Sequence, residues 1–202
     1  MIHKITLKFS QKMAEDGIIQ SEKTSIYAYG LELMFSSAVG IIALFLVSVI
    51  LGAPWLWIPY LAGFIPTRLT AGGYHAKTHY GCVVSFTLAY ATAFFLLTVV
   101  GAFEVLTIIL SIFALVTVII LAPVEARSKP IKDILRKRNR KNSILIGILN
   151  LILSVTMVAT GTVIFNQYFQ RVYNMYCMGF FAAGVSLVVA RIIQAMERRV
   201  PV

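Results

Sequence analysis

Six charge-free apolar stretches constrain the fold of this chain more than any other feature of its sequence. They cover more than half of the 202 residues and lie at 33–52, 53–67, 82–103, 105–124, 143–165 and 172–190. A helix needs about 20 apolar residues to cross a bilayer, and a chain in lipid must pair its own backbone polar groups. With only 13% charged residues, the composition excludes an ordinary soluble enzyme. The sequence therefore predicts an all-α polytopic membrane protein with about six transmembrane helices.

The positions of the Lys and Arg residues predict how these helices are oriented. If all six stretches cross the membrane, 17 of the 18 Lys and Arg residues lie on the same side. Cytoplasmic connections carry the excess of positive charge, so we expect both termini and the basic loop 125–142 in the cytoplasm. The second stretch, 53–67, is short and contains prolines. If it were re-entrant and did not cross, the Lys and Arg residues would be distributed over both sides of the membrane. We therefore expect it to cross as well.

Residues 1–30 are predicted to form an interfacial helix region ahead of the transmembrane bundle 33–190, within a single domain 1–202. Two stripes follow helical spacing, one apolar and one basic: Ile2, Ile5, Phe9 and Met13, and Lys4, Lys8 and Lys12. Such a helix lies in the inner-leaflet interface, where its apolar side enters the acyl chains and anionic headgroups attract its lysines. Membrane lipids are therefore expected partners. A helix packed against its own spans is the alternative.

A polar island at residues 68–82 separates the second and third stretches. It contains two of the three histidines and one of the two cysteines, at the expected cytoplasmic boundary. A cysteine there stays reduced, and Cys82 becomes a nucleophile if an imidazole takes its proton and cations such as Arg68 favour the anion. Gly72 and Gly73 permit positive φ and a close approach of backbone N–H groups to a developing oxyanion. The island is thus equipped for nucleophilic acyl transfer.

The spacing of the two histidines leaves their roles open. In one continuous helix His75, His79 and Cys82 would share a face, and His79 would be the imidazole nearer to the thiol. His75 can reach Cys82 only across a turn, which the neighbouring glycines allow. The same face could instead hold a zinc ion for a metal-dependent hydrolase, but residues 33–103 contain no Asp or Glu to act as general base. The main prediction therefore includes no metal and no cofactor.

Several residues of the island form a known motif: Arg68, Gly73, His75-Ala76-Lys77 and Cys82. In a 202-residue chain with six apolar stretches, this motif resembles the accessory gene regulator B family, and so does the later run 122–131. The resemblance extends over essentially the whole chain. It implies a multi-pass cysteine endopeptidase of the bacterial cell membrane that cuts a short amphipathic propeptide at the inner membrane face. It also implies an acyl-enzyme thioester and the release of a cyclic autoinducing peptide for quorum sensing.

Carried onto this sequence, the resemblance implies that Cys82 is the nucleophile and His75 the general base. Arg68 and Gly73 occupy supporting positions, and His79 is a further candidate participant. A third partner that orients the imidazole would come from a small set of candidates: Glu125, Asn142 and Asn150.

The basic residues are candidates for binding the substrate: Lys4, Lys8, Lys12, Arg136, Lys137 and Arg138. The first three lie in the interface where an amphipathic propeptide helix would arrive already oriented. The other three belong to the basic loop, which could attract an acidic substrate tail or serve only to set the topology. No nucleic-acid partner is expected, because basic residues in so hydrophobic a chain are first of all a topology signal.

Two other predictions concern the apolar stretches. A small transporter is an alternative function, but it would need ionisable residues within the spans, and only Glu104 lies between two stretches, at the outer side. The small residues of the last two stretches could support a homodimer or packing within the chain: Gly161, Ala182, Ala183 and Gly184. Cys177 lies among apolar residues and is expected to be a small buried hydrophobe.

Overall fold

The computed structural model describes residues 2–74, 78–100, 104–124, 133–164 and 166–199. Its elements, in chain order, are α1 (Ile2–Glu15), η1 (Ser21–Lys23), α2 (Thr24–Ile50), α3 (Trp57–Ala71), α4 (His79–Val100), α5 (Glu104–Leu121), α6 (Asp133–Ile164) and α7 (Gln167–Arg199). These residues contain no strand, and Gly72 and Val124 form an isolated β-bridge. The predicted all-α fold is confirmed.

Each of the six apolar stretches coincides with a helix, from α2 for the first to α7 for the last. In the described part of the chain, five helices are long and apolar enough to cross a membrane, namely α2, α4, α5, α6 and α7. α3 has only 15 residues, about 22 Å, because the turn at Gly52 (φ +71°) and the following proline delay its start and Gly72 ends it. The polytopic membrane architecture is confirmed, with α3 shorter than a full transmembrane helix.

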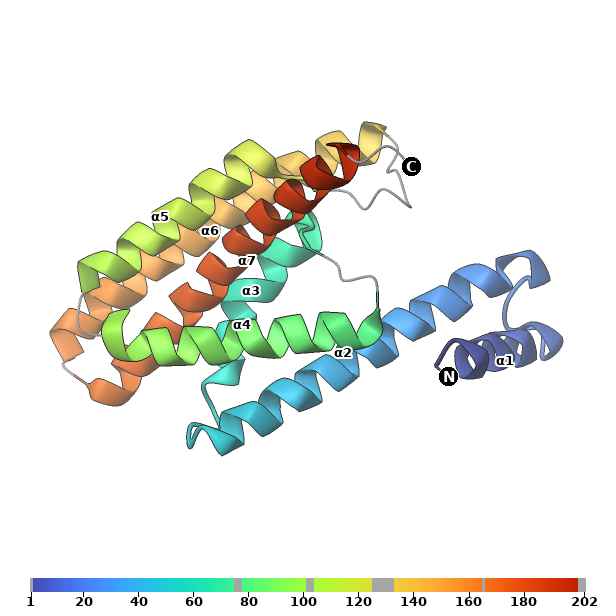
Figure 1. Ribbon diagram of the computed structural model, residues 1–202, viewed down its shortest axis with the longest axis horizontal. Coiled ribbons are helices and arrows are strands. Elements are labelled where there is room, and N and C mark those ends of the chain that lie inside the picture. The colour runs from blue at the N-terminus through green and yellow to red at the C-terminus, as the bar shows by residue number, and fades with distance from the viewer. Residues whose placement is uncertain (1, 75–77, 101–103, 125–132, 165, 200–202) are drawn as a thin grey trace.

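α7 is the central helix of the bundle. It packs against α3, α4, α5 and α6, and Figure 1 shows these helices arranged around it. Half of the residues in its most apolar part are buried inside the protein, whereas at most 28% are buried in the other four candidate spans. Their exposed apolar faces suit contact with lipid.

α3 and α7 approach so closely that their crossing requires two glycines. A Cβ at Gly63 would collide with the carbonyl oxygen of Tyr176 and would lie 2.9 Å from the amide nitrogen of Phe180. A Cβ at Gly179 would collide with the carbonyl oxygen of Tyr60. Backbone atoms cannot rotate away, so this contact depends on small residues, as close helix pairs in membranes generally do. The crossing fixes the position of α3, and with it the polar end of α3, against α7.

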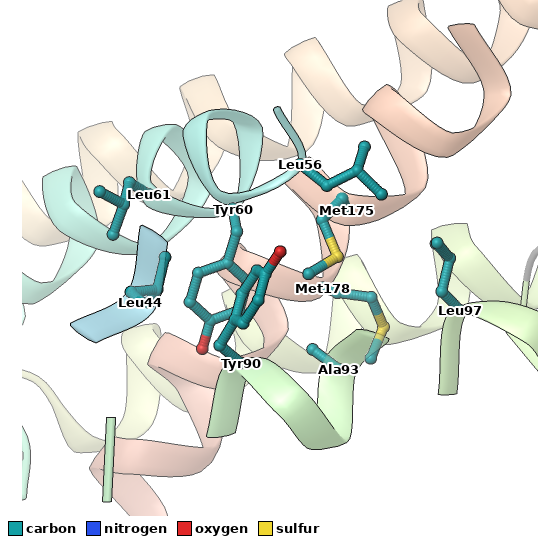
Figure 2. Close-up of a cluster of buried hydrophobic side chains, with 9 residues drawn as sticks. All are labelled: Leu44, Leu56, Tyr60, Leu61, Tyr90, Ala93, Leu97, Met175 and Met178. Atoms are coloured by element: carbon teal, nitrogen blue, oxygen red, sulfur yellow. The ribbon is translucent and has the colours of Figure 1, made fainter. Parts of the chain in front are cut away.

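A buried cluster fills the space where α2, α3, α4 and α7 meet (Figure 2). Its members are Leu44, Leu56, Tyr60, Leu61, Tyr90, Ala93, Leu97, Met175 and Met178. The rings of Tyr60 and Tyr90 pack edge to face with centroids 5.2 Å apart, and Figure 2 shows them side by side within the cluster. The Tyr90 hydroxyl also donates a hydrogen bond of 2.9 Å to the hydroxyl of Ser48. The cluster therefore joins α2 and α4 to the α3–α7 pair.

Three of the small residues considered for a homodimer pack within the chain. A Cβ at Gly161 would collide with the ring of Tyr173, and one at Gly184 would lie 2.9 Å from the Cα of Ala114. Ala183 is buried. These positions therefore serve contacts between helices of the same chain.

α1 lies along the first half of α2, apart from the remainder of the bundle (Figure 1). Its side toward α2 carries Thr6 and Ser10, which are fully buried. Its apolar stripe points elsewhere, with Ile5 57% and Phe9 58% exposed. α1 thus packs on its own second helix and still keeps an apolar face free, as an interfacial helix requires. Insertion of this face into lipid stays a prediction.

The basic segment differs from its prediction as a loop over residues 125–142. Residues 133–142 form the first turns of α6, whose 32 residues extend over about 48 Å. Asp133 is favourable in the first turn of a helix, and Lys and Arg are good helix formers, so the charged segment continues the apolar helix beyond a hydrocarbon core of about 30 Å. Residues 125–132 lie outside the described part of the chain.

Candidate functional site

The candidate site lies where the C-terminal end of α3 turns toward α4. α3 ends at Gly72, whose φ is +76° and whose N–H donates to the carbonyl of Arg68 at 3.1 Å. Gly73 follows with a φ of +131°, a conformation that favours glycine. A Cβ at Gly72 would collide with the carbonyl oxygen of Val124, and one at Gly73 would collide with the guanidinium of Arg68. The double glycine is therefore required both by the backbone and by two close neighbours.

The side chain of Arg68 holds this turn in place. Its Nη1 donates hydrogen bonds to the carbonyl of Gly72 (3.1 Å) and to the hydroxyl of Ser186 on α7 (2.8 Å), and its Nη2 donates to the carbonyl of Tyr74. The N–H of Tyr74 donates to Ser186 and lies 3.1 Å from both its carbonyl and its hydroxyl oxygen. Both backbone polar groups of Tyr74 are thus fixed. The next residue in the sequence is His75.

Cys82 lies in the first turn of α4, at the other end of the same connection. Thr78 caps this helix, because its hydroxyl accepts a hydrogen bond from the N–H of Gly81 (3.1 Å) and its carbonyl accepts one from the N–H of Cys82 (3.1 Å). The thiol of Cys82 is free and half-buried. The N-terminal end of a helix carries a partial positive charge, which stabilises negative charge close to it.

Arg68 and Cys82 lie at the two ends of the connection between α3 and α4. Arg68 follows the apolar part of α3, and burial lowers the pKa of its guanidinium from the ordinary value. The electrostatic effect of Cys82 acts in the opposite direction and raises that pKa. Because an arginine in a protein stays protonated, Arg68 is a permanent cation near the thiol.

The structure brings together some of the predicted site residues. Arg68, Gly73 and Cys82 share the region between α3 and α4. His79 begins α4, whereas His75 and Glu125 lie outside the described residues. The pairing of an imidazole with the thiol therefore stays a prediction.

The predicted substrate-binding cations lie on two other elements. Lys4, Lys8 and Lys12 belong to α1, where the last two are exposed. The remaining three form an exposed group in the first turns of α6: Arg136, Lys137 and Arg138. Neither group is part of the turn that Arg68 organises.

Asn150 takes part in helix packing. It is buried on α6, where its amide donates to the hydroxyl of Thr67 on α3 (3.3 Å) and its Oδ1 accepts a hydrogen bond from the hydroxyl of Tyr176 on α7. Both ends of the amide are engaged, so Asn150 supports the position of α3 next to Arg68. Its role toward an imidazole stays a prediction. Asn142, the other asparagine considered, is exposed on α6.

A segment from α5 reaches the double-glycine turn from the other side. The N–H of Val124 donates to the carbonyl of Ala71 at 2.8 Å, and Val124 pairs with Gly72 in a parallel β-bridge. Glu125 is the next residue in the sequence. The segment after α5 and the segment that leads to His75 are therefore held together by backbone contacts at Val124 and Gly72.

Two residues of α7 were not recognised from the sequence, although they organise both segments. Ser186 contacts Arg68, 118 residues away, and Arg191 donates a hydrogen bond of 3.0 Å to the carbonyl of Leu121, 70 residues away. A serine within an apolar stretch and an arginine at its end are ordinary features of membrane helices. No local signal in the sequence distinguishes them.

Cys177 has the buried surroundings that the sequence predicts. It is 1% exposed on α7, and the hydroxyls of Ser111 and Ser154 lie close to it. Within the described ranges, no group of three or more His, Cys, Asp and Glu residues could hold a metal ion. The proposed zinc ligands include His75, which lies outside those ranges, so the metal-dependent alternative stays a prediction.

Comparison with known protein families gives one match that covers most of the chain. The family model described as accessory gene regulator B matches residues 3–190. This range includes the whole polar island, the start of α6 and Ser186. Searches of curated proteins and of solved structures returned no match.

Proposed function

Since the chain belongs to the accessory gene regulator B family, which has a general role in processing quorum-sensing propeptides, we propose that it is a membrane cysteine endopeptidase with Cys82 as nucleophile. The arrangement around Arg68 carries this proposal. A half-buried free thiol in the first turn of α4 interacts with a guanidinium that also holds the residue preceding His75. The nucleophile Cys82, the cation Arg68 and the residue before His75 thus belong to the same connection between α3 and α4.

In the proposed reaction, His75 takes the proton of the Cys82 thiol and the thiolate attacks the scissile carbonyl of the propeptide. The tetrahedral intermediate collapses with cleavage of the C–N bond, and His75 returns its proton to the leaving amine of the C-terminal fragment. The N-terminal fragment stays on Cys82 as a thioester. A Cys or Ser side chain of that fragment then attacks the thioester, which releases a cyclic thiolactone or lactone and restores the thiol.

The negative charge of the tetrahedral intermediate requires a donor. The sequence suggests backbone amides of the double glycine for this role, but the N–H of Gly72 already donates to the carbonyl of Arg68. This engagement favours the guanidinium of Arg68 as the group that offsets the charge. Gly73 then serves to let the guanidinium lie against the turn.

The substrate is proposed to arrive along the membrane surface. α1 exposes an apolar stripe that includes Ile5 and Phe9, and its exposed Lys8 and Lys12 suit anionic headgroups. A propeptide helix that lies in the same interface reaches the site already oriented, which lowers the entropic cost of the encounter. The exposed cations 136–138 of α6 suit an acidic propeptide tail. A site at the membrane boundary also protects the thioester from water.

The thioester intermediate provides the direct test of this proposal. A propeptide whose ring-closing Cys or Ser is replaced by Ala can still acylate Cys82. Its N-terminal fragment then stays bound, because it has no side chain to attack the thioester. We expect the protein in lipid vesicles to acquire a covalently bound N-terminal fragment at Cys82, which mass spectrometry detects and neutral hydroxylamine removes. A chelator should not change the acylation. Acylation elsewhere, or activity that a chelator removes and zinc restores, would favour the metal-dependent hydrolase.

The orientation in the membrane is also a proposal, with both termini and the start of α6 in the cytoplasm. Arg138 and Arg171 lie near opposite ends of the α6–α7 hairpin and are exposed. In a protein in which Cys82 and Cys177 are replaced by Ala, we expect a cysteine at position 171 to react with an impermeant maleimide in intact cells. A cysteine at position 138 should react only in opened cells. The reverse pattern would contradict the charge-based topology.

A further inference from the structure

We infer that Ser186 on α7 is a positioning residue of the cleavage site, which acts through Arg68 and Tyr74 without touching the substrate. The inference rests on the proposed function, because it assigns Ser186 to the same site. The observation behind it is structural and does not depend on that function: Ser186 accepts three hydrogen bonds, one from Arg68 and two from the N–H of Tyr74.

The contacts of Ser186 require a hydroxyl. Its Oγ accepts a hydrogen bond of 2.8 Å from Arg68 Nη1 and one of 3.1 Å from the N–H of Tyr74. A serine hydroxyl has two acceptor lone pairs, and both are used here. The carbonyl of Ser186 lies a further 3.1 Å from the same Tyr74 N–H. Only serine or threonine supplies this acceptor on an α-helix at so short a reach.

The position of Ser186 is fixed by the close crossing of α3 and α7 at Gly63 and Gly179. Gly179 precedes Ser186 by about two turns of α7 and therefore lies on the same face, the face that meets α3. Arg68 lies on α3 beyond Gly63, the glycine at the same crossing. A Cβ at Gly73 would lie only 2.6 Å from the Oγ of Ser186, so the hydroxyl lies directly against the double-glycine turn. The α3–α7 crossing thus sets the distance between Ser186 and Arg68.

Loss of the hydroxyl should affect the chemistry more than the binding of substrate. Without Ser186 Oγ, the Arg68 guanidinium loses the acceptor that fixes it between α3 and α7, and Tyr74 loses a partner for its N–H. Arg68 would keep its hydrogen bond to the Tyr74 carbonyl, but the guanidinium would lose its contact with α7, and Tyr74 would be held there only by the Ser186 carbonyl. α1 and the start of α6, to which substrate binding is assigned, have no part in these contacts.

The test compares Ser186→Thr with Ser186→Val, two changes that add matched side-chain volume and differ in the hydroxyl. Ser186→Val is expected to lower kcat for propeptide cleavage about tenfold to a hundredfold, with KM changed less than about threefold. Ser186→Thr should stay within about threefold of the unmodified protein. Ser111→Ala is the control for loss of a buried hydroxyl elsewhere, because Ser111 donates to its own helix at the Thr107 carbonyl.

A second measurement reports on the site without substrate. In the folded protein in detergent, we expect iodoacetamide to alkylate Cys82 several-fold more slowly in Ser186→Val than in Ser186→Thr at neutral pH, as followed by mass spectrometry of the Cys82 peptide. A role limited to helix stability would lower the melting temperature without separating the two variants in this assay.

Equal cleavage and equal alkylation in the two variants would overturn the inference, and so would a defect in KM alone. Failure of the proposed function has a different signature, namely cleavage by a Cys82→Ala protein. The alkylation rates do not depend on cleavage, so the positioning of Cys82 by way of Ser186 is tested in either case.

Discussion

Replacing Cys82 by alanine is expected to abolish propeptide processing, with a cleavage rate lowered on the order of 10⁴-fold or more. The proposed reaction has no other nucleophile. Alanine keeps the backbone N–H that bonds to the carbonyl of Thr78, and it is a good helix former at the start of α4. The amount of protein in the membrane should therefore stay the same. Release of the C-terminal fragment from a co-expressed propeptide, with quantification of the membrane fraction, measures both outcomes.

The second cysteine supplies the matched control. Cys177→Ala removes a thiol that is buried on α7 between two serine hydroxyls, so cleavage should continue. His75→Ala should match the loss seen for Cys82→Ala, whereas His79→Ala should retain activity if His75 is the base. Cleavage that survives in the Cys82→Ala protein would refute the thiol mechanism.

Replacing Gly179 by leucine is expected to have the largest effect on stability. Its side chain would occupy the place of the Tyr60 carbonyl on α3, and a backbone atom can make room only if the two helices separate. Overpacking of this kind lowers the free energy of unfolding by about 3 kcal/mol or more. Because α3 carries Arg68, separation also breaks its contact with Ser186, and processing should fail as well. Thermal unfolding in detergent, followed by circular dichroism, measures the loss.

Gly30→Leu provides the comparison for this substitution. Gly30 lies within α2, and a Cβ there would meet nothing within 4 Å, so leucine should be tolerated. A Gly179→Leu protein that melts and cleaves like the Gly30→Leu protein would show that α3 and α7 do not cross closely at this point.

The helices could be predicted because hydropathy is a local property. The apolar stretch 105–124 needs no knowledge of its neighbours to indicate a membrane helix, and α5 (Glu104–Leu121) covers most of it. The short length of α3 follows from its flanking prolines and glycines in the same local way. The helical start of α6 was missed because its Lys and Arg residues were interpreted as a topology signal and a substrate contact, although the same residues favour helix.

The site could be predicted only as far as it is continuous in sequence. Arg68, Gly73 and Cys82 lie within one short island, so their residue types and spacing already indicate acyl transfer. The contact of Arg68 with Ser186 and the role of Asn150 depend on which helices pack together. Packing of this kind follows from shape, as at Gly63 and Gly179, and a single sequence does not encode it in any local pattern.

The three contacts of α7 impose a condition on its length. Gly179 meets Tyr60 on α3, Ser186 meets Tyr74 after the double-glycine turn, and Arg191 meets the end of α5. One residue inserted or deleted after Gly179 would rotate the rest of the helix by about 100° and shift it by about 1.5 Å. Ser186 and Arg191 would then both miss their partners, even though every side chain was still present. Insertions and deletions are therefore expected in the connections between helices, whereas the number of residues between Gly179 and Arg191 on α7 has to stay the same.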